Sequence, residues 1–442
     1  MKNIQLIFFA LSILFISQII KAQNDSVTAF STRVLASPLQ SPPFPGSEWD
    51  GAPIIGLPND ETYYPLQKFL HLVNKKNGIK FYGWVDGGGD ISSSKYSNAP
   101  TAYDLVPNSV QLDQAIFRIE REPNTVQTEH ADWGFLVDNI YGMDYRYTIA
   151  KGIFSDQLLK HNNLYGYDPA QVYALLYIPK VAEGMLIKAG RFISPSDVEA
   201  QWAPDNYLYS HSLMFTVDPY TFTGVQATIR LSKYIQVEVG AHGGNDVAPW
   251  SNSSNLNGMA MLRWVSKNNN NSLYGGITSI GKGHYTNEHD NLQMVVETWG
   301  HRFSKKVHMM TELYYMWQYD APIGGTVIEG PPESYFMGTG MGALVPGISS
   351  AVGFVNYFQI LISSKNYISI RNDFLNDTQG NRTGYATAYS SHTIGFAHHF
   401  NNTFTIRPEL RYETAYGNGI TPYDNGTKKN QYSLAADLIV RF

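Results

Sequence analysis

The stretch NQYSLAADLIVRF, residues 430–442, decides the fold of this chain. One parity of the stretch is apolar throughout: Tyr432, Leu434, Ala436, Leu438, Val440 and Phe442. Because successive side chains of a β-strand point to opposite faces, this strand has one continuous apolar face. A soluble chain seldom ends on an aromatic residue inside a strand, since termini fray into water. A membrane barrel does, because its last strand pairs with its first, and we therefore assign Phe442 a role in assembly.

The other end of the chain has the pattern of an export signal. Lys2 precedes a mostly apolar run at residues 4–20, and a small residue, Ala22, offers a cleavage point. The alternative is an uncleaved anchor helix, but four polar residues interrupt the run and make it a poor permanent span. We expect residues 1–22 to be a cleaved signal peptide.

Composition narrows the class of protein further. Without residues 1–22, the chain keeps 30 basic and 37 acidic residues, a net charge of −7, and it has no basic cluster that would suit a nucleic-acid partner. It has no cysteine, so an exported chain of this size is held together without disulfides. After Ala22, no run reaches the roughly 18 apolar residues of a spanning helix. The 14% aromatic content, with 30 Tyr and 38 Gly, is typical of barrel strands with aromatic girdles.

Two parts follow the signal. Residues 23–78 are rich in proline, which favours an extended segment without sheet pairing, and the spacing of apolar residues at 65–77 predicts a short amphipathic helix that begins at Pro65 and stops at Gly78. The helix would lie on the rim or in the lumen of a barrel. Residues 79–442 form the barrel.

The barrel region alternates strands with turn-rich stretches. We expect strands near 79–88, 110–121, 133–142, 170–178, 184–192, 222–232, 235–243, 257–266, 272–281, 291–303, 307–319, 351–363, 366–374, 387–400, 402–414 and 431–442. The count is about sixteen, with fourteen or eighteen as alternatives, and it is even, as bacterial single-chain barrels require. The fold class is therefore all-β, a transmembrane antiparallel barrel with longer loops at one end. A soluble sandwich or propeller fits less well, since no repeat of about 40–50 residues is present.

Charges of both signs lie on one parity of several strands. In the strand at 402–414, the apolar face is Phe404, Ile406, Pro408, Leu410 and Tyr412, and the charged face is Arg407, Glu409, Arg411 and Glu413. Such charges must face water or each other, because unpaired burial costs several kcal/mol per charge. We place these residues in the lumen as pore-lining groups: Arg118, Glu120, Arg371, Asp373, Arg407, Glu409, Arg411 and Asp437. The alternative is that these charges pair with each other, lock the wall and plug the barrel, with no conduction. Pro408 cannot donate to the ladder, so we expect a bulge or a rim position there.

Signals for catalysis and metal binding are weak. Ser391-His392 and His211-Ser212 are adjacent, but neighbours on a strand point to opposite faces, which argues against a serine hydrolase. The histidines at 284–289 and 398–399 lack further ligands at a recognisable spacing. An acidic turn at 372–377 departs from the alternating calcium-loop pattern. We expect no catalytic residue, metal site or cofactor.

Three stretches carry a resemblance to a known family: Phe81-Tyr82-Gly83-Trp84-Val85, the region from Gly184 to Val225, and Ile370-Arg371-Asn372-Asp373-Phe374 together with Ile406-Arg407-Pro408-Glu409-Leu410-Arg411-Tyr412. Together they make most of the mature chain similar to the putative beta-barrel porin-2, OmpL-like family. The resemblance implies an outer-membrane barrel with porin-like properties. It implies no catalytic residues.

The sequence thus predicts a porin-like channel for passive diffusion of small hydrophilic solutes, in the outer membrane of a Gram-negative bacterium. Its expected partners are outer-membrane lipid, the solutes, and the barrel-assembly machinery through the C-terminal strand. One alternative is a closed barrel that serves as a scaffold or surface-binding protein, with loops 245–257 and 320–347 as contact surface. An outer-membrane hydrolase is a minor alternative. Channel conductance separates the first two.

Overall fold

The structure is a computed structural model that describes residues 53–59, 62–71, 78–101, 103–155, 158, 164–195, 198–324 and 342–442. The predicted signal peptide and the segment up to residue 52 lie outside the described residues. No helix in the described part of the chain is long and apolar enough to cross a bilayer.

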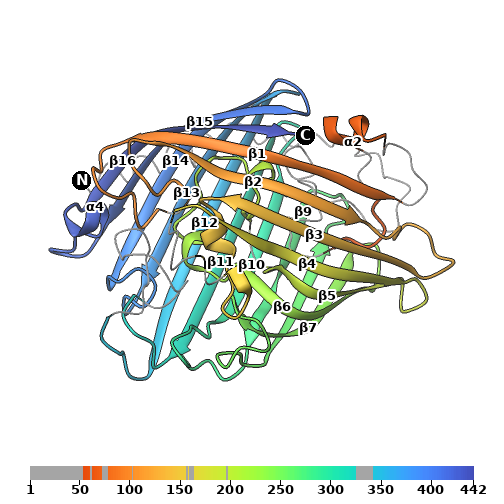
Figure 1. Cartoon of the computed structure of the whole chain (residues 1–442), viewed down its shortest axis with the longest axis horizontal. Helices are drawn as coiled ribbons and strands as arrows, with labels where there is room; N and C mark the ends of the chain where they lie inside the picture. The colour runs from red at the N-terminus through yellow and green to blue at the C-terminus, as the bar shows by residue number, and fades with distance from the viewer. Residues whose placement is uncertain are drawn as a thin grey trace.

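Sixteen antiparallel strands close into one barrel, in which each strand pairs with its neighbours in sequence and β1 pairs with β16 (Figure 1). The strands are β1 (Ile79–Ser92), β2 (Val110–Arg121), β3 (Asp132–Gly142), β4 (Gly166–Ile178), β5 (Met185–Ile193), β6 (Thr221–Arg230), β7 (Ile235–Asn245), β8 (Asn257–Val265), β9 (Asn271–Ile280), β10 (Gln293–Arg302), β11 (Val307–Tyr319), β12 (Ile348–Ser363), β13 (Asn366–Asp377), β14 (Thr387–His399), β15 (Phe404–Ala415) and β16 (Asn430–Arg441). The helices are short: α2 (Pro65–Phe69), α3 (Tyr145–Thr148), α4 (Tyr423–Gly426) and the 3-10 turns η2 (Ala203–Asp205) and η3 (Phe215–Val217). The predicted barrel and its strand count are confirmed.

The C-terminal residue seals the seam between the first and last strands. The backbone N–H of Phe442 donates to the carbonyl of Gly83 at 2.9 Å, and the N–H of Gly83 donates back to the carbonyl of Phe442 at 3.1 Å. The pairing then runs from Trp84 opposite Arg441 to Ser92 opposite Ser433. Because the seam is fully paired, neither strand is left with a free edge.

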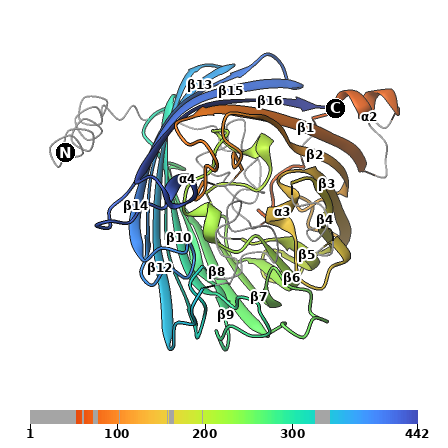
Figure 2. The same ribbon diagram turned by 60° about the vertical axis from the view of Figure 1, so that its left-hand side comes forward.

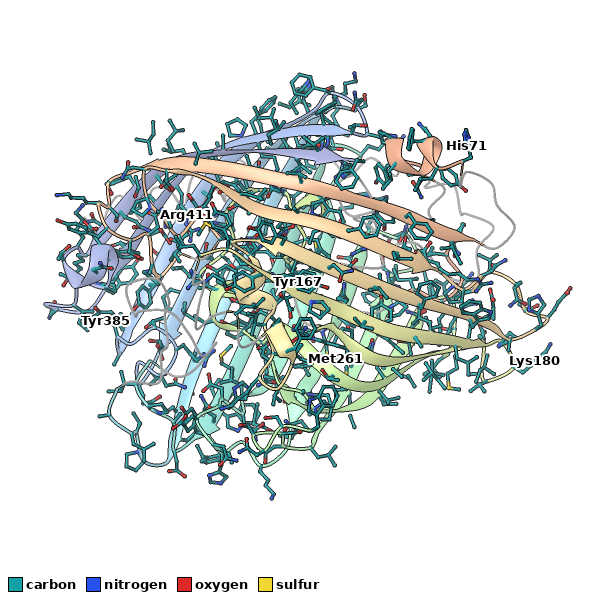
Figure 3. All side chains as sticks on the ribbon, in the orientation of Figure 1. His71, Tyr167, Lys180, Met261, Tyr385 and Arg411 are labelled. Carbon is teal, nitrogen blue, oxygen red and sulfur yellow. The ribbon has the colours of Figure 1, made fainter. Side chains whose placement is uncertain are left out.

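The two ends of the barrel differ in the length of their connections. At the end that holds the C-terminus, strands are joined by short turns such as 231–234, 303–306 and 364–365. At the other end the connections are long, and they include 93–109, 143–165, 194–220, 320–347 and 416–429. Lys180 and Tyr385 mark the two ends in Figure 3. Short periplasmic and long extracellular connections are usual for outer-membrane barrels, so we call these the periplasmic and extracellular ends.

Each strand has an outward apolar face, as the alternation predicts. In β16, Tyr432 and Leu434 are each more than half exposed on the outer wall, whereas Asp437 is buried on the inner face. The adjacent residues Ser391 and His392 of β14 lie on opposite faces, the first buried and the second exposed, which confirms that they do not meet. Alternation of this kind follows from a wall that has lipid on one side only.

Two local predictions were wrong. Pro408 lies within β15 in unbroken register with β16, opposite Ala436, rather than at a bulge or at the rim. The proline interrupts the pairing with β14 only locally. β15 pairs with β14 as far as Ile406 and again from Glu409 onward, and only the two residues between them have no partner on β14. The acidic stretch 372–377 belongs to strand β13 and is not a turn. Its side chains therefore alternate between two faces and cannot converge on one calcium ion.

The part of the Pro-rich segment that the structure describes divides between rim and lumen. Helix α2 lies beside the end of the barrel that holds the C-terminus (Figure 2), where Tyr64 stacks on Tyr82 of β1 with ring centroids 5.4 Å apart. It is shorter than expected, and residues 72–77 of the predicted helix lie outside the described residues. Phe69 is 79% exposed, so this helix occupies the rim. Residues 53–59 are different, because their neighbours are inward-facing side chains of the wall.

Candidate functional site in the barrel lumen

The connection between β5 and β6 folds into the barrel instead of extending beyond it. We call residues 194–220 the inner segment, of which 196–197 lie outside the described residues. It carries η2 and η3, and its residues from Val198 to Tyr220 are all buried. His211 and Ser212 lie here rather than on a strand, which corrects the assumption made for that pair. A segment with so many buried backbone groups needs partners for them, and the wall supplies these.

Strand β13 provides the first of these partners. The Arg371 guanidinium donates to Oγ of Ser210 at 3.0 Å and lies 3.3 Å from Oε1 of Glu199, both on the inner segment. Two positions along the same face, the Asp373 carboxylate accepts a hydrogen bond from the backbone N–H of Leu213 at 3.1 Å and lies 3.3 Å from Nε of Arg371. Two predicted lumen residues thus hold the middle of the inner segment.

Strand β15 holds the segment at three further points. Arg407 donates to the backbone carbonyls of Ala203 and Asn206, each at 2.8 Å. The Glu409 carboxylate accepts from the N–H of Tyr209 at 3.0 Å and of Ser210 at 3.2 Å. Arg411 donates to the carbonyl of His211 at 2.8 Å. Charge-assisted hydrogen bonds of this kind are stronger than neutral ones, so the three charges fix the position of the inner segment.

The other three predicted residues contact the wall itself. Arg118 and Asp138 form a two-point pair across β2 and β3, at 2.7 and 2.8 Å. Glu120 accepts a hydrogen bond from the hydroxyl of Tyr82 at 2.9 Å. Asp437 accepts from Nε of Arg407 at 3.1 Å. All eight predicted residues therefore lie on the inner face and are buried, and their pore-lining role is taken up below as a proposal.

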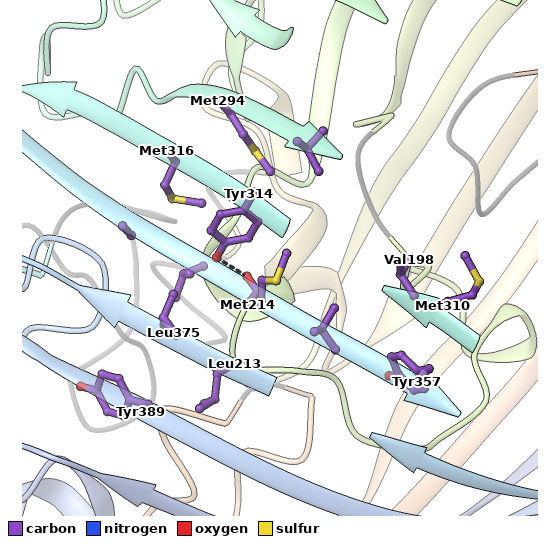
Figure 4. Packing of buried hydrophobic residues seen from close by; sticks show 14 of the residues in the cluster. Val198, Leu213, Met214, Met294, Met310, Tyr314, Met316, Tyr357, Leu375 and Tyr389 are labelled. Carbon is purple, nitrogen blue, oxygen red and sulfur yellow. Dashed lines mark hydrogen bonds between the residues drawn. The ribbon is translucent and has the colours of Figure 1, made fainter. Parts of the chain in front are cut away.

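Beside these charged contacts, the inner segment packs against an apolar, methionine-rich part of the wall. Figure 4 shows Leu213 and Met214 of the segment among side chains of β10–β14, where the hydroxyl of Tyr314 donates to the carbonyl of Met214 at 2.9 Å. Met294 and Met316 lie directly opposite each other on β10 and β11. The buried methionines of this cluster are Met214, Met259, Met261, Met294, Met310 and Met316. Because thioethers adapt to irregular gaps, they let an irregular segment pack tightly on a curved wall.

Stacked aromatic rings join the inner segment to two other extracellular connections. Tyr103, from 93–109, stacks on His211 with ring centroids 4.0 Å apart and on Tyr147 of α3 with centroids 4.3 Å apart. His211 also stacks on Phe215 of η3 at 4.5 Å. Three connections thus meet inside the barrel. The inner segment is held by the two other extracellular connections as well as by the wall.

Burial shifts the protonation of groups on these connections. It lowers the pKa of His211 to about 3, which keeps this imidazole neutral in the aromatic stack. It raises the pKa of Asp144 to about 7, although a hydrogen bond from Gln114 opposes the shift. It also raises the pKa of Asp246 to about 7, against hydrogen bonds from Tyr220 and Thr221 at the end of the inner segment. These carboxyl groups are therefore partly protonated near neutral pH.

Residues 53–59 occupy the periplasmic mouth. Ile55 is fully buried and packs against Tyr177, Leu186 and Leu175, which face inward from β4 and β5. Its backbone N–H donates to Oε1 of Gln236 on β7 at 2.9 Å. A piece of chain that precedes the barrel thus lies against its inner wall at β4 to β7.

Glycine on inward strand positions is the one signal in the sequence that could have predicted the inner segment. A Cβ on Gly88 would lie 2.5 Å from Cζ of Tyr209. In the same way, Leu208 leaves no room for a Cβ on Gly395, and Met214 leaves none on Gly353. A glycine inside a strand often marks the close approach of another segment, and three on inward positions indicate such an approach.

Comparisons with known proteins agree with this architecture. The sequence model of the family described as putative beta-barrel porin-2, OmpL-like, matches residues 78–442. None of the curated protein sequences matches the chain.

Solved structures similar to this chain include an outer membrane protein, an outer membrane channel and a porin. OmpT, an outer membrane protein of Vibrio cholerae, has 8% identity over 82% of this chain and 99% of that chain, with a TM-score of 0.49. The outer membrane channel DcaP of Acinetobacter baumannii has 11% identity over 83% and 99%, with a TM-score of 0.47. A mutant of Rh. blastica porin has 9% identity over 82% and 100%, with a TM-score of 0.42. At these identities the likeness concerns the fold alone. The family match spans the whole barrel, and the chain therefore belongs to the putative beta-barrel porin-2, OmpL-like family, as a porin-like outer-membrane barrel.

Proposed function

We propose that this barrel is a channel through which small hydrophilic solutes diffuse across the outer membrane of a Gram-negative bacterium, after cleavage of the signal peptide. One observation carries the proposal: a closed sixteen-strand wall surrounds an inner segment that is held by charges of both signs. A barrel of about sixteen strands is wide enough for an aqueous path. In this proposal the inner segment narrows that path without filling it.

The eight predicted charged residues set the width and the field of this path. Five of them, on β13 and β15, fix the inner segment, and the charges of all eight act on ions that pass beside it. Charged groups at a constriction sort solutes by sign and size. In this proposal those five residues act on the pore through the segment that they hold, the other three line the wall directly, and no catalytic step is involved.

Single-channel recording of the purified protein in planar bilayers tests the proposal. Stepwise, steady conductance supports a channel, and protein unfolded by heat before addition is the matched control. Silence across several salts and voltages, with a folded barrel confirmed by gel mobility, would exclude passive diffusion.

A closed barrel is the second candidate, and a specific observation favours it. Three extracellular connections meet in the lumen through the ring stack of Tyr103, His211 and Tyr147, and Ile55 blocks part of the periplasmic mouth. A barrel filled in this way would act as a scaffold, with its long loops at 245–257 and 320–347 as contact surface. The same recording decides between the two candidates.

A further inference from the structure

One part of the outer wall carries polar side chains at mid-height. Five neighbouring strands, β10 to β14, each place one such residue on the outward face. On β10 to β13 it lies between apolar neighbours of the same parity, and on β14 it lies between Ser390 and Ile394. We call these residues the outer polar row: Glu297, Thr311, Asn356, Asn372 and His392. None of them lies at a strand end, where headgroups or water could solvate it.

The apolar setting of the row is clear from its neighbours on the same strands. Val295 and Trp299 flank Glu297 on β10, and both are at least 40% exposed on the outer wall. Phe354 and Phe374 lie beside the two asparagines in the same way, and both are exposed. The row therefore lies in the band of the wall that lipid chains would cover, where amide and carboxylate groups find no partners.

The row is organised across the strands. Nδ2 of Asn356 donates to Oγ1 of Thr311 at 2.6 Å, and Nδ1 of His392 lies 2.8 Å from Oδ1 of Asn372. Asn356 and Asn372 are directly opposite each other in the register of β12 and β13. The four residues thus form a continuous line, whose two hydrogen-bonded pairs leave further donors and acceptors pointing outward.

Glu297 stands at the β10 end of the row, and its carboxylate lies across Gly275 of β9. Among the described residues it forms no ion pair. His392 stands at the opposite end, on β14. The row therefore presents an acid at one end, a base at the other and amides between.

We propose that the outer polar row is the contact surface between two copies of this chain, related by a two-fold axis along the membrane normal. Such a rotation keeps every residue at its own depth, so polar groups at mid-height meet polar groups. It reverses the order of the strands, so the Glu297 end of one copy lies on the same side of the contact as the His392 end of the other. Asn356, on the middle strand, then faces its own equivalent, and an amide can both donate to and accept from its copy.

This inference does not depend on conduction through the barrel. Polar side chains act as bridges between membrane segments because lipid offers them no hydrogen bond. A second copy is the occupant best suited to a surface that is complementary to itself, and an isologous contact closes after two subunits.

Cysteine cross-linking tests the proposal directly, because the natural chain has no cysteine. Asn356→Cys lies next to the axis, and in native outer membranes treated with a membrane-permeant oxidant it should yield a disulfide-linked dimer. Val239→Cys, on the exposed outer face of β7, is the matched control and should stay monomeric.

The outcomes are distinct. A dimer with Asn356→Cys alone supports the contact. No cross-link with either variant, equal cross-linking of both, or a product whose mass is not twice that of the chain overturns it. Asn356→Leu with Asn372→Leu gives a second readout, a fall in the dimer fraction in mild detergent at unchanged folded-band mobility. A wild-type protein that is monomeric in mild detergent, together with no cross-linked dimer of Asn356→Cys in membranes, would also overturn the proposal.

Discussion

Arg371 on β13 and Glu199 on the inner segment form a buried ion pair, with 3.3 Å between Nη1 and Oε1. The hydroxyl of Tyr357 also donates to the same carboxylate oxygen. The pair lies 172 positions apart in sequence, so it ties the middle of the chain to its last quarter. Its loss should loosen the inner segment but leave the backbone ladder of the barrel intact.

Glu199→Gln tests this tie. Breaking one partner of a buried pair costs about 3–5 kcal/mol, and we expect the cost to appear as mobility of the inner segment. The measurement is limited proteolysis within 198–213, together with open-channel current noise, both of which should increase. Glu183→Gln is the control, because Glu183 pairs with Arg230 at 2.9 Å but is 47% exposed, where a pair contributes little. Equal protease resistance of Glu199→Gln and wild type would contradict the expectation.

Deletion of Phe442, or its replacement by a charged residue, should impair assembly into the membrane. The residue provides the last two backbone hydrogen bonds of the seam, and without them Gly83 of β1 has no partner on the β16 side. Heat-modifiable gel mobility reports the yield of folded barrel. Pro58→Ala, before the barrel, should have a smaller effect, and a normal folded band after the deletion would refute the assembly role.

Arg407→Ala combined with Arg411→Ala should shift the reversal potential toward cations. The change removes two positive charges beside Glu409, Glu413 and Asp437 and leaves the barrel folded. Reversal potentials in a salt gradient measure the shift. Arg121→Ala is the control, because Arg121 pairs with Asp132 near the periplasmic turn, outside the lumen. An unchanged reversal potential would show that these arginines do not act on the permeating ion.

A charge on the lipid face should act on stability instead of selectivity. Leu438→Arg or Leu410→Arg should cost about 2–4 kcal/mol near the midplane, because the guanidinium would face hydrocarbon. Urea unfolding in lipid vesicles measures the loss, and Asn430→Arg, at the rim, should cost less than about 1 kcal/mol. A harmless Leu410→Arg, with the arginine pair of β15 essential for folding, would mean that the two faces are reversed.

Ile55→Asp should open the periplasmic mouth. The substitution places a carboxylate against Tyr177 and Leu186, and an unpaired buried charge is strongly disfavoured, so residues 53–59 should leave the wall. Single-channel conductance should rise. Phe69→Asp on α2 is the control, since that side chain is already exposed, and an unchanged conductance in Ile55→Asp would separate this segment from the solute path.

The strands were predictable because each wall position meets one of two environments. The range expected at 307–319 is the range of β11, and β2 likewise has the expected bounds, since their faces differ sharply in polarity. The prediction for Pro408 was wrong because the ladder tolerates an interruption on one side when the other partner strand keeps its register.

The inner segment was not predictable from alternation. Its contacts join residues far apart, such as Arg371 and Ser210 at a separation of 161, and nothing in a local pattern tells which charges will meet a loop. The inward position of the eight charged residues could be predicted because polar and apolar residues alternate along a strand that has lipid on one side only. Their partner Glu199 was missed because it lies on no strand.

The binding position of Ile55 has a consequence for the order in which parts of the chain fold after export. Its backbone is bound to Gln236, which lies 181 positions later, on β7. During export residues 53–59 emerge before every strand, yet their binding surface exists only once β4 to β7 have paired side by side. Residues 53–59 are thus exported first, but they can bind only after this part of the wall has formed.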